Sequence, residues 1–347
     1  MVAVVQRLPW LFFSLPAGVI TDRVDRRTLM IGANSIRAVI TGVVALVVLG
    51  RQSSLPGPDE VDAVVGGDTD VLLYGLILVA TLLLGMAEVL YDNAGQTLMP
   101  SLVVTSNLEK ANGRLWSAEQ VANTFAGPPL GALLLAVAFS VPFFVDATTF
   151  VVSAALIALL PRSASDKRSK VAEGPGWRAD LTEGFRWLWN HELLRPLAII
   201  LGLLNMLFTA TAAVMVLFAQ EVLQTSATEF AILSTGGAIG GVLGGWSASA
   251  ISRRIGSGTS LALTLSVGAI TQLTTGLTSL WGVAWLMAAL SMFVAVLWNV
   301  ITVSLRQTII PDQLLGRVNS VYRFFAWGMM PLGALLGGAI VTLLDGP

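Results

Sequence analysis

The chain has 347 residues, of which 55% are hydrophobic and only 12% are charged, and its mean hydropathy is +0.78. A soluble globular protein carries about 25% charged residues, so the composition excludes an ordinary soluble domain and predicts a polytopic membrane protein. The net charge of −1 carries little information, whereas the absence of cysteine and the single histidine, His191, exclude disulfides, thiolate chemistry and a histidine-based metal centre. We therefore expect no metal and no cofactor.

Ten apolar segments follow one another along the chain, each near the roughly 20 residues that a helix needs to cross a bilayer. We predict an all-α membrane helix bundle of about ten transmembrane helices. The first segment contains Pro9 and Pro16, which membrane helices tolerate. Its alternative interpretation as a signal peptide lacks a basic start and a clear cleavage site. The segments are residues 3–21, 28–50, 71–95, 115–138, 142–160, 196–219, 229–251, 258–279, 281–304 and 316–343.

A short polar turn, Asp22–Arg27, joins the first two segments and holds three arginines and two aspartates. If this turn is cytoplasmic and the helices alternate, only four of the 20 Lys and Arg residues lie away from the cytoplasmic side. The outer loop 51–70 then carries five acidic residues instead. This distribution follows the positive-inside rule and fixes the predicted orientation of every helix.

The long connection 161–195 has mixed charge and separates five helices from five. We predict an N-terminal half, residues 1–160, a cytoplasmic linker, residues 161–195, and a C-terminal half, residues 196–347. Within the linker, Asp180–Leu194 has the apolar spacing of an amphipathic helix lying at the membrane surface. Its simplest role is to anchor the linker, and the alternative is a regulatory role.

The two predicted halves repeat each other. The sequence Pro129-Leu-Gly-Ala-Leu-Leu134 recurs unchanged at Pro331–Leu336. Parallel repeats around a central linker are typical of transporters that bind substrate between their halves. A second repeat relates the polar turns: Gly18-x-x-x-Asp22-x-x-x-Arg26-Arg27 is echoed by Gly245-x-x-x-Ser249-x-x-x-Arg253-Arg254.

The first of these turns resembles the loop motif between helices 2 and 3 of the major facilitator superfamily. Leu8-Pro-Trp10, Asp146-Ala-Thr-Thr-Phe150 and Gly184-Phe-Arg-Trp187 extend the resemblance to the bacterial efflux branch that includes the enterobactin exporter. Asp25 stands where the general motif has glycine, as it often does in that branch. The family has twelve helices, so the resemblance implies that helices 2–11 are present here and that helices 1 and 12 are missing.

We expect the polar turn to act as a conformational latch. Asp22 and Arg26 can pair at the cytoplasmic end, Asp92 is the expected partner of the Arg23–Arg27 cluster, and alternating access requires this contact to break and re-form. The alternative is that the turn only fixes topology. The candidate latch residues are Gly18, Asp22, Arg23, Arg26, Arg27, Asp92, Arg253 and Arg254.

Charged side chains inside a membrane cost about 2.5–3.5 kcal/mol each on insertion scales, so each needs a reason. Glu88, one turn from Asp92, is the main candidate for protonation. The remaining candidates for proton coupling or substrate binding are Arg37, Glu119, Asp146 and Arg323, with ion pairing or water contact as their alternative roles. Candidates for lining a substrate cavity, or simply for packing, are Trp10, Asn205 and Asn299.

Gly127, Pro128 and Gly131 resemble the helix 5 motif of exporters, although Asn123 stands where that motif begins with glycine.

The sequence shows no phosphate-binding glycine loop of the Walker type, which favours coupling to an ion gradient over ATP hydrolysis. It also shows no nucleophile–base pair, so we do not expect the protein to be an enzyme. We expect a proton-coupled exporter of a drug-like or siderophore-like amphiphile, monomeric in the bacterial inner membrane, with lipid contacts and no nucleic acid partner. The alternatives are an importer or lipid flippase, and a non-transporting sensor or scaffold.

Overall fold

The computed structural model describes residues 2–51, 71–161 and 176–344. These residues form helices joined by short turns, with no strand among them, so the predicted all-α class is confirmed. The acidic residues of loop 51–70 and the first part of the linker, residues 162–175, lie outside the described residues.

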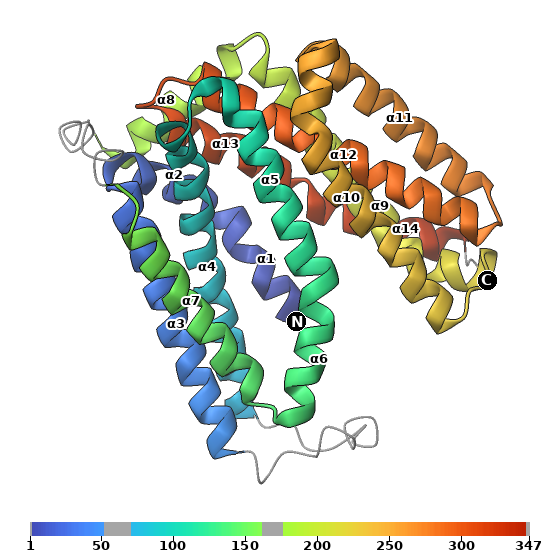
Figure 1. Ribbon diagram of the computed structural model, residues 1–347, viewed down its shortest axis with the longest axis horizontal. Helices are drawn as coiled ribbons and strands as arrows, with labels where there is room; N and C mark the ends of the chain where they lie inside the picture. Colours follow the sequence, from blue (N-terminus) through green and yellow to red (C-terminus); the bar gives the residue numbers. More distant parts are fainter. Residues whose placement is uncertain (1, 52–70, 162–175, 345–347) are drawn as a thin grey trace. The chain divides into compact units, whose positions relative to one another are not determined.

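The helices follow the order predicted from the apolar segments (Figure 1). They are α1 (Val2–Phe12), α2 (Ser14–Arg23), α3 (Arg26–Gly50), α4 (Val71–Leu102), α5 (Leu108–Gln120), α6 (Gly127–Val137), α7 (Val141–Ala158), α8 (Trp177–Asn190), α9 (Leu194–Leu217), α10 (Ala227–Ile255), α11 (Ser257–Leu277), α12 (Trp281–Ile309), α13 (Leu315–Gly328) and α14 (Met330–Leu344).

Nine helical stretches among the described residues are long and apolar enough to cross a membrane. The predicted first segment is instead divided into α1 and α2 at Phe13. Pro16 explains the break, because it has no N–H to donate to the carbonyl of Phe12. Several helices extend beyond their predicted apolar spans, as α4 does to Leu102, because the polar ends of membrane helices continue past the hydrocarbon core.

The helices group into two compact units. The first contains Met1–Leu102, Pro129–Arg195 and Ile310–Trp327, and the second contains Val103–Pro128, Pro196–Ile309 and Gly328–Pro347. The first unit thus includes α13 from the predicted C-terminal half, and the second includes α5 from the predicted N-terminal half. The boundaries of the two sequence halves stay a prediction.

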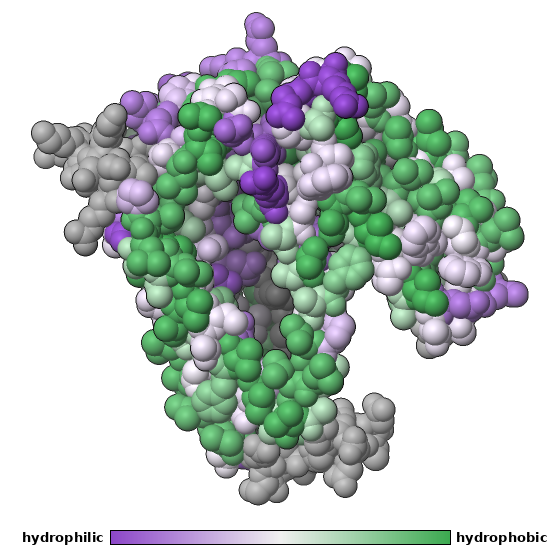
Figure 2. Space-filling model, viewed as in Figure 1, coloured by the Kyte–Doolittle hydropathy of each residue, from purple (hydrophilic) through white to green (hydrophobic). Residues whose placement is uncertain are grey.

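In the first unit, α3 packs against α4 and α7, α1 and α2 pack along α4, and α8 contacts α2 (Figure 1). Met30, Ala94 and Leu98 belong to the buried cluster that joins α3 to α4. The outward faces of α3 and α7 are apolar and exposed, with Val39 on α3 and Leu156 on α7 at 66% and 60% exposure (Figure 2). Such faces suit contact with lipid and would not suit water.

In the second unit, α10 packs against α12 and α5. Gly236, Gly240 and Gly244 are spaced by four residues, and a Cβ atom on each would press on a backbone carbonyl of α12. The carbonyl oxygen of Trp285 would lie 2.6 Å from a Cβ at Gly236. Small residues at this spacing let membrane helices approach closely, which explains the glycine-rich sequence of α10.

Candidate functional site

Asp22, at the C-terminal end of α2, binds the first turn of α13. Its Oδ1 accepts a hydrogen bond from the backbone N–H of Gly316 at 2.8 Å, and its Oδ2 accepts one from the N–H of Arg317 at 2.9 Å. The Nε of Arg317 donates to the same Oδ2 at 3.2 Å. N–H groups in the first turn of a helix lack partners within the helix and carry the positive end of its dipole. Asp22 therefore caps α13 and pairs with its arginine.

The side chain of Asp22 is only 2% exposed, although it lies just past the predicted membrane segment 3–21. Burial raises the pKa of Asp22 to about 6. The hydrogen bonds from Arg317 and Gly316 and the charge of Arg317 act in the opposite direction but do not offset the loss of hydration. The carboxyl group of Asp22 in the folded protein thus titrates near pH 6.

Gly18 lies one turn before Asp22 and allows α2 and α13 to touch. A Cβ atom at Gly18 would lie 2.8 Å from the carbonyl oxygen of Gly316 and would collide with the side chain of Ser320. A Cβ at Gly316 would in turn lie 2.8 Å from the Cγ of Asp22. Only glycine fits at these two positions while the helices stay in contact.

The three arginines of the turn have different partners. Arg26 is buried, lies 4.0 Å from Asp22, donates to the carbonyl of Thr97 on α4, and lies 3.7 Å from the carboxylate of Asp312. The predicted pairing of Asp22 with Arg26 is therefore present, but Arg317 is the shorter partner. Arg27 instead donates to the carbonyls of Ile157 and Ala158 at the end of α7, where a cation suits the negative end of the helix dipole.

Arg23 turns toward the linker helix α8. Its Nε and Nη2 donate to Oδ2 of Asp180 at 3.0 and 2.6 Å. The Nη1 of Arg317 donates to Oδ1 of the same carboxylate at 3.1 Å and to Glu183 at 2.6 Å. We call the six residues Asp22, Arg23, Arg26, Asp180, Glu183 and Arg317 the α2–α13 charge cluster; it joins α2, α3, α8 and α13.

The repeated turn in the second unit makes a different contact. Gly245 packs on α5, where its Cβ would lie 2.7 Å from the carbonyl oxygen of Gly113 and would collide with the hydroxyl of Ser117. Ser249 occupies the position of Asp22, and Arg253 and Arg254 are exposed in the last turn of α10. The described residues place no carboxylate within ion-pair distance of these two arginines. The carboxylate near this contact is Glu109, which accepts from the hydroxyl of Ser252 at 2.7 Å, and a latch role for Arg253 and Arg254 stays a prediction.

Asp92 and Arg323 form a second ion pair in the first unit, at 3.2 Å. Asp92 therefore pairs with α13 and not, as predicted, with the Arg23–Arg27 cluster. The reason is depth: Arg26 reaches α4 at Thr97, more than one turn further toward the predicted cytoplasmic end. Arg323 is buried, and its Nη1 lacks a hydrogen-bond partner among the described residues.

An aromatic pair covers the guanidinium of Arg323. Trp10 on α1 lies 4.4 Å from it in a cation–π arrangement and stacks on Trp327 with ring centroids 4.8 Å apart. A polar layer follows one turn away, where Asn319 donates to Asn93 at 2.8 Å. Trp10 and Arg323, selected separately from the sequence, are thus brought together.

Arg37 on α3 has aromatic neighbours. Its guanidinium lies 4.2 Å from the ring centroid of Phe150 and 5.5 Å from that of Tyr91, and it donates to Asn34 at 3.4 Å. Asp146 on α7 is near enough for electrostatic attraction. The structure thus stabilises this membrane-embedded cation through ring faces and an amide.

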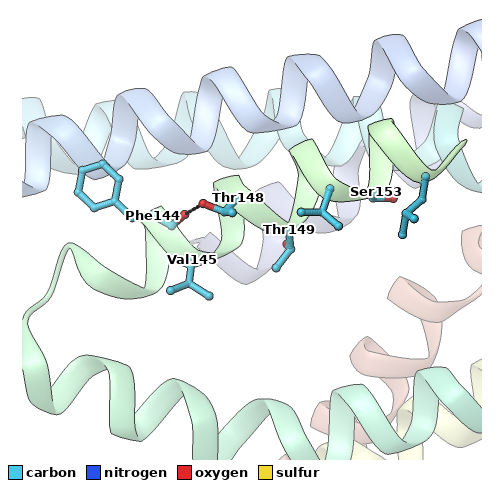
Figure 3. Close-up of a pocket in the computed structure, with 7 residues that line it drawn as sticks. Phe144, Val145, Thr148, Thr149 and Ser153 are labelled. Atoms are coloured by element: carbon cyan, nitrogen blue, oxygen red, sulfur yellow. Dashed lines mark hydrogen bonds between the residues drawn. The ribbon is translucent and has the colours of Figure 1, made fainter. Parts of the chain in front are cut away.

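A groove of about 490 Å³ runs along α7, lined by side chains of that helix (Figure 3). The hydroxyls of Thr148 and Thr149 donate to carbonyls of their own helix, and Ser153 accepts from Asn34 at 2.8 Å. Because these polar groups are already bonded, the groove presents mainly methyl groups. Its lining residues are Phe144, Val145, Thr148, Thr149, Val152, Ser153 and Leu156.

The other predicted site residues are distributed over both units. Glu88 is half-buried on α4 in the first unit, one turn from Asp92. In the second unit, Glu119 is exposed on α5, Asn205 is half-buried on α9, and Asn299 on α12 donates to the carbonyl of Ala295 at 2.9 Å. Their joint role as a substrate site stays a prediction.

The exporter-like motif marks a local change of helix type. Val121–Ala126 forms a π-helical turn directly before Gly127. Pro128 and the proline that follows it cannot donate to the preceding turn, which favours this looser hydrogen bonding. A Cβ at Gly127 would lie 2.9 Å from the carbonyl of Ala122. Among the described residues, no atom lies within 4 Å of a Cβ position at Gly131, so this glycine makes no close helix contact there.

Sequence reasoning missed Asp180 and Glu183, and counted Arg317 only among the basic residues. One signal could have found Arg317: Gly113-Arg114-x-x-Ser117 recurs as Gly316-Arg317-x-x-Ser320. Gly113 and Ser117 contact Gly245, and Gly316 and Ser320 contact Gly18. The glycine of each polar-turn repeat therefore packs against one copy of the Gly-Arg-x-x-Ser repeat.

The sequence of this chain matches the model of the Major Facilitator Superfamily over residues 2–342. The chain belongs to that superfamily. This major facilitator protein is a multi-pass membrane transporter, and it is not an enzyme. The resemblance to the enterobactin exporter branch stays a prediction.

Two curated relatives of this transporter are informative. The multidrug efflux pump Tap of Mycobacterium tuberculosis is 26% identical over 354 residues, covering 98% of this chain and 77% of the relative. The uncharacterized MFS-type transporter YvqJ of Bacillus subtilis is 26% identical over 159 residues, covering 45% of this chain and 38% of the relative.

Solved structures share the fold at low identity. A bacterial homologue of the iron transporter ferroportin, in an outward-facing state with soaked iron, has a TM-score of 0.75 and 18% identity, covering 99% of this chain and 83% of the neighbour. The human organic anion transporter MFSD10 has a TM-score of 0.68 and 18% identity, with 99% and 78% covered. FucP in its outward conformation gives 0.68 and 14%, with 99% and 82% covered.

Proposed function

We propose that this transporter exports a drug-like or siderophore-like amphiphile from the cytoplasm, driven by protons that move inward. Family membership supplies the transport function, and the similarity to a multidrug efflux pump over nearly the whole chain supports export. The bacterial relatives favour the inner membrane. The absence of a Walker-type loop from the sequence favours an ion gradient over ATP as the energy source.

The observation that carries the proposal is the contact between Asp22 and the first turn of α13. It joins a helix of the predicted N-terminal half to one of the predicted C-terminal half at their predicted cytoplasmic ends. A buried ion pair gains little net free energy because desolvation offsets its attraction. Such a contact can break when water enters, so it is suited to a latch that opens in each transport cycle.

Carboxyl groups near this latch are the candidates for proton coupling. Asp92 neutralises the buried Arg323, and Glu88 lies one turn from it on the same helix. Protonation of Asp92 would remove the counter-ion of a buried cation and favour separation of α4 from α13. We propose Asp92 and Glu88 as the coupling pair, with Trp10 and Arg323 on the substrate path.

Everted membrane vesicles test direction and coupling together. Vesicles that contain the protein should accumulate an amphiphilic dye such as ethidium when the interior is acid, and a protonophore should abolish the uptake. Uptake that survives the protonophore would overturn proton coupling. Accumulation only in right-side-out vesicles would indicate an importer, and dye binding without accumulation would indicate a sensor.

A further inference from the structure

The linker helix α8 is attached to the latch by a buried carboxylate. Asp180 lies in the first turn of α8 and is only 5% exposed, which is uncommon for an aspartate. It binds Arg23 of α2 with one oxygen and Arg317 of α13 with the other, at 2.6 and 3.1 Å. One side chain of the linker therefore bridges both helices of the latch.

The contact of Asp180 with Arg317 also affects how Arg317 binds Asp22. The guanidinium is planar, so fixing one of its nitrogens fixes the direction of the others. Asp180 holds Nη1, and Nε then lies 3.2 Å from Asp22. Glu183 also accepts from Nη1, but its side chain is 58% exposed, and an exposed pair contributes little.

Close packing joins α8 to α13 independently of charge. A Cβ atom at Gly184 would lie 3.1 to 3.2 Å from the side chain and backbone of Arg317. Phe185 lies one residue further, stacks on Trp189 and has its ring centroid 6.2 Å from that of Phe325. The helix thus has a defined seat on α13, and Gly184 sets its distance from Arg317.

We propose that Asp180 is a positioning residue of the transport cycle. It orients Arg317 toward Asp22 and holds Arg23, so α8 has to release at least one of the two arginines before α2 and α13 separate. The charged groups that face it are Arg23 on α2 and Arg317 on α13, with Glu183 beside it on α8 and Asp22 and Arg26 beyond the arginines. The linker is therefore part of the latch; this inference rests on the latch in the proposed function.

The test uses a buried reporter in a chain that has no native cysteine. Ser320 is 1% exposed and faces Gly18 across the contact, so Ser320→Cys should react with N-ethylmaleimide only when α2 and α13 separate. In membranes, Asp180→Asn should raise the labelling rate about tenfold, as expected for loss of one ionic partner of a buried cluster. Asp180→Glu should partly restore the slow rate, and the matched control Glu183→Gln should change it by less than about twofold.

Each outcome decides between distinct claims. Slow labelling in Asp180→Asn together with fast labelling in Asp22→Asn would overturn the role of α8 and leave the latch intact. Slow labelling in both would overturn the latch itself. Equal acceleration by Glu183→Gln would overturn the assignment to Asp180. If Asp180→Asn does not fold, Gly184→Val displaces α8 without removing a charge, and it should accelerate labelling if the proposal holds and leave it unchanged if it does not.

Discussion

The carboxylate of Asp22 binds the backbone N–H and the Nε of Arg317, a residue 295 positions further along the chain. The contact combines a helix cap with an ion pair, and it is possible because Gly18 and Gly316 bring the two backbones together. The polar turn Asp22–Arg27, whose charges predict the orientation of the helices, is therefore also part of a tertiary contact between the predicted halves.

Asp22→Asn should lower transport at least about tenfold. The neutral amide removes one ionic partner of Arg317, which then stays buried with fewer hydrogen-bond acceptors. Dye efflux from cells at matched expression measures the effect. Asp25→Asn is the control, because Asp25 caps α3 at Thr28 and is exposed. Asp25→Asn should keep transport near the wild-type rate, and an equal loss in both variants would contradict a specific role for Asp22.

Gly18→Ala should destabilise the α2–α13 contact by about 1–3 kcal/mol, the usual cost of overpacking, since the new methyl group meets Ser320 and the carbonyl of Gly316. We expect faster labelling of Ser320→Cys and slower transport. Gly32→Ala on α3 is the matched control because no atom lies within 4 Å of its Cβ position. Indistinguishable labelling in the two variants would show that the close approach is unimportant.

The stability of the wild-type protein relative to Asp22→Asn should fall as the pH rises through about 6. The pKa of Asp22 is raised in the folded protein from 3.8 to about 6, so protonation of this carboxyl group favours the folded over the unfolded chain. This contribution is fully present below pH 3.8 and is lost above pH 6, with an upper limit of about 3 kcal/mol. Thermal unfolding in detergent between pH 4 and 8 measures it, and a difference that grows with pH would contradict the sign.

Asp92→Asn should lower stability by roughly 2 kcal/mol, less than the 3–5 kcal/mol of fully buried pairs because Asp92 is partly exposed. It leaves Arg323 buried without its counter-ion. The double variant Asp92→Asn with Arg323→Met should regain stability but not transport. Thermal unfolding and dye efflux separate the two effects. Restored transport in the double variant would show that the pair serves structure alone.

The apolar segments predicted the helices well because bilayer thickness imposes a length on each. The break at Phe13 and the π-helical turn before Gly127 were missed, since both depend on which carbonyls the prolines leave free. Asp22 and Gly18 could be selected from local spacing. The partner Arg317 is marked in the sequence only by the repeat of Gly113-Arg114-x-x-Ser117. Asp180 has no such signal, because it is remote in sequence from Arg23 and Arg317 and meets them only after the helices pack.

A distance measurement across the α2–α13 contact tests the central claim most directly. Val24 and Gln313 are exposed beside the two helix ends, and the chain has no other cysteine, so Val24→Cys with Gln313→Cys accepts two spin labels cleanly. Double electron–electron resonance in lipid nanodiscs should show a short and a long distance, with the long population increased by Asp22→Asn. A single distance, unchanged by Asp22→Asn and by added dye, would contradict a latch that opens during transport.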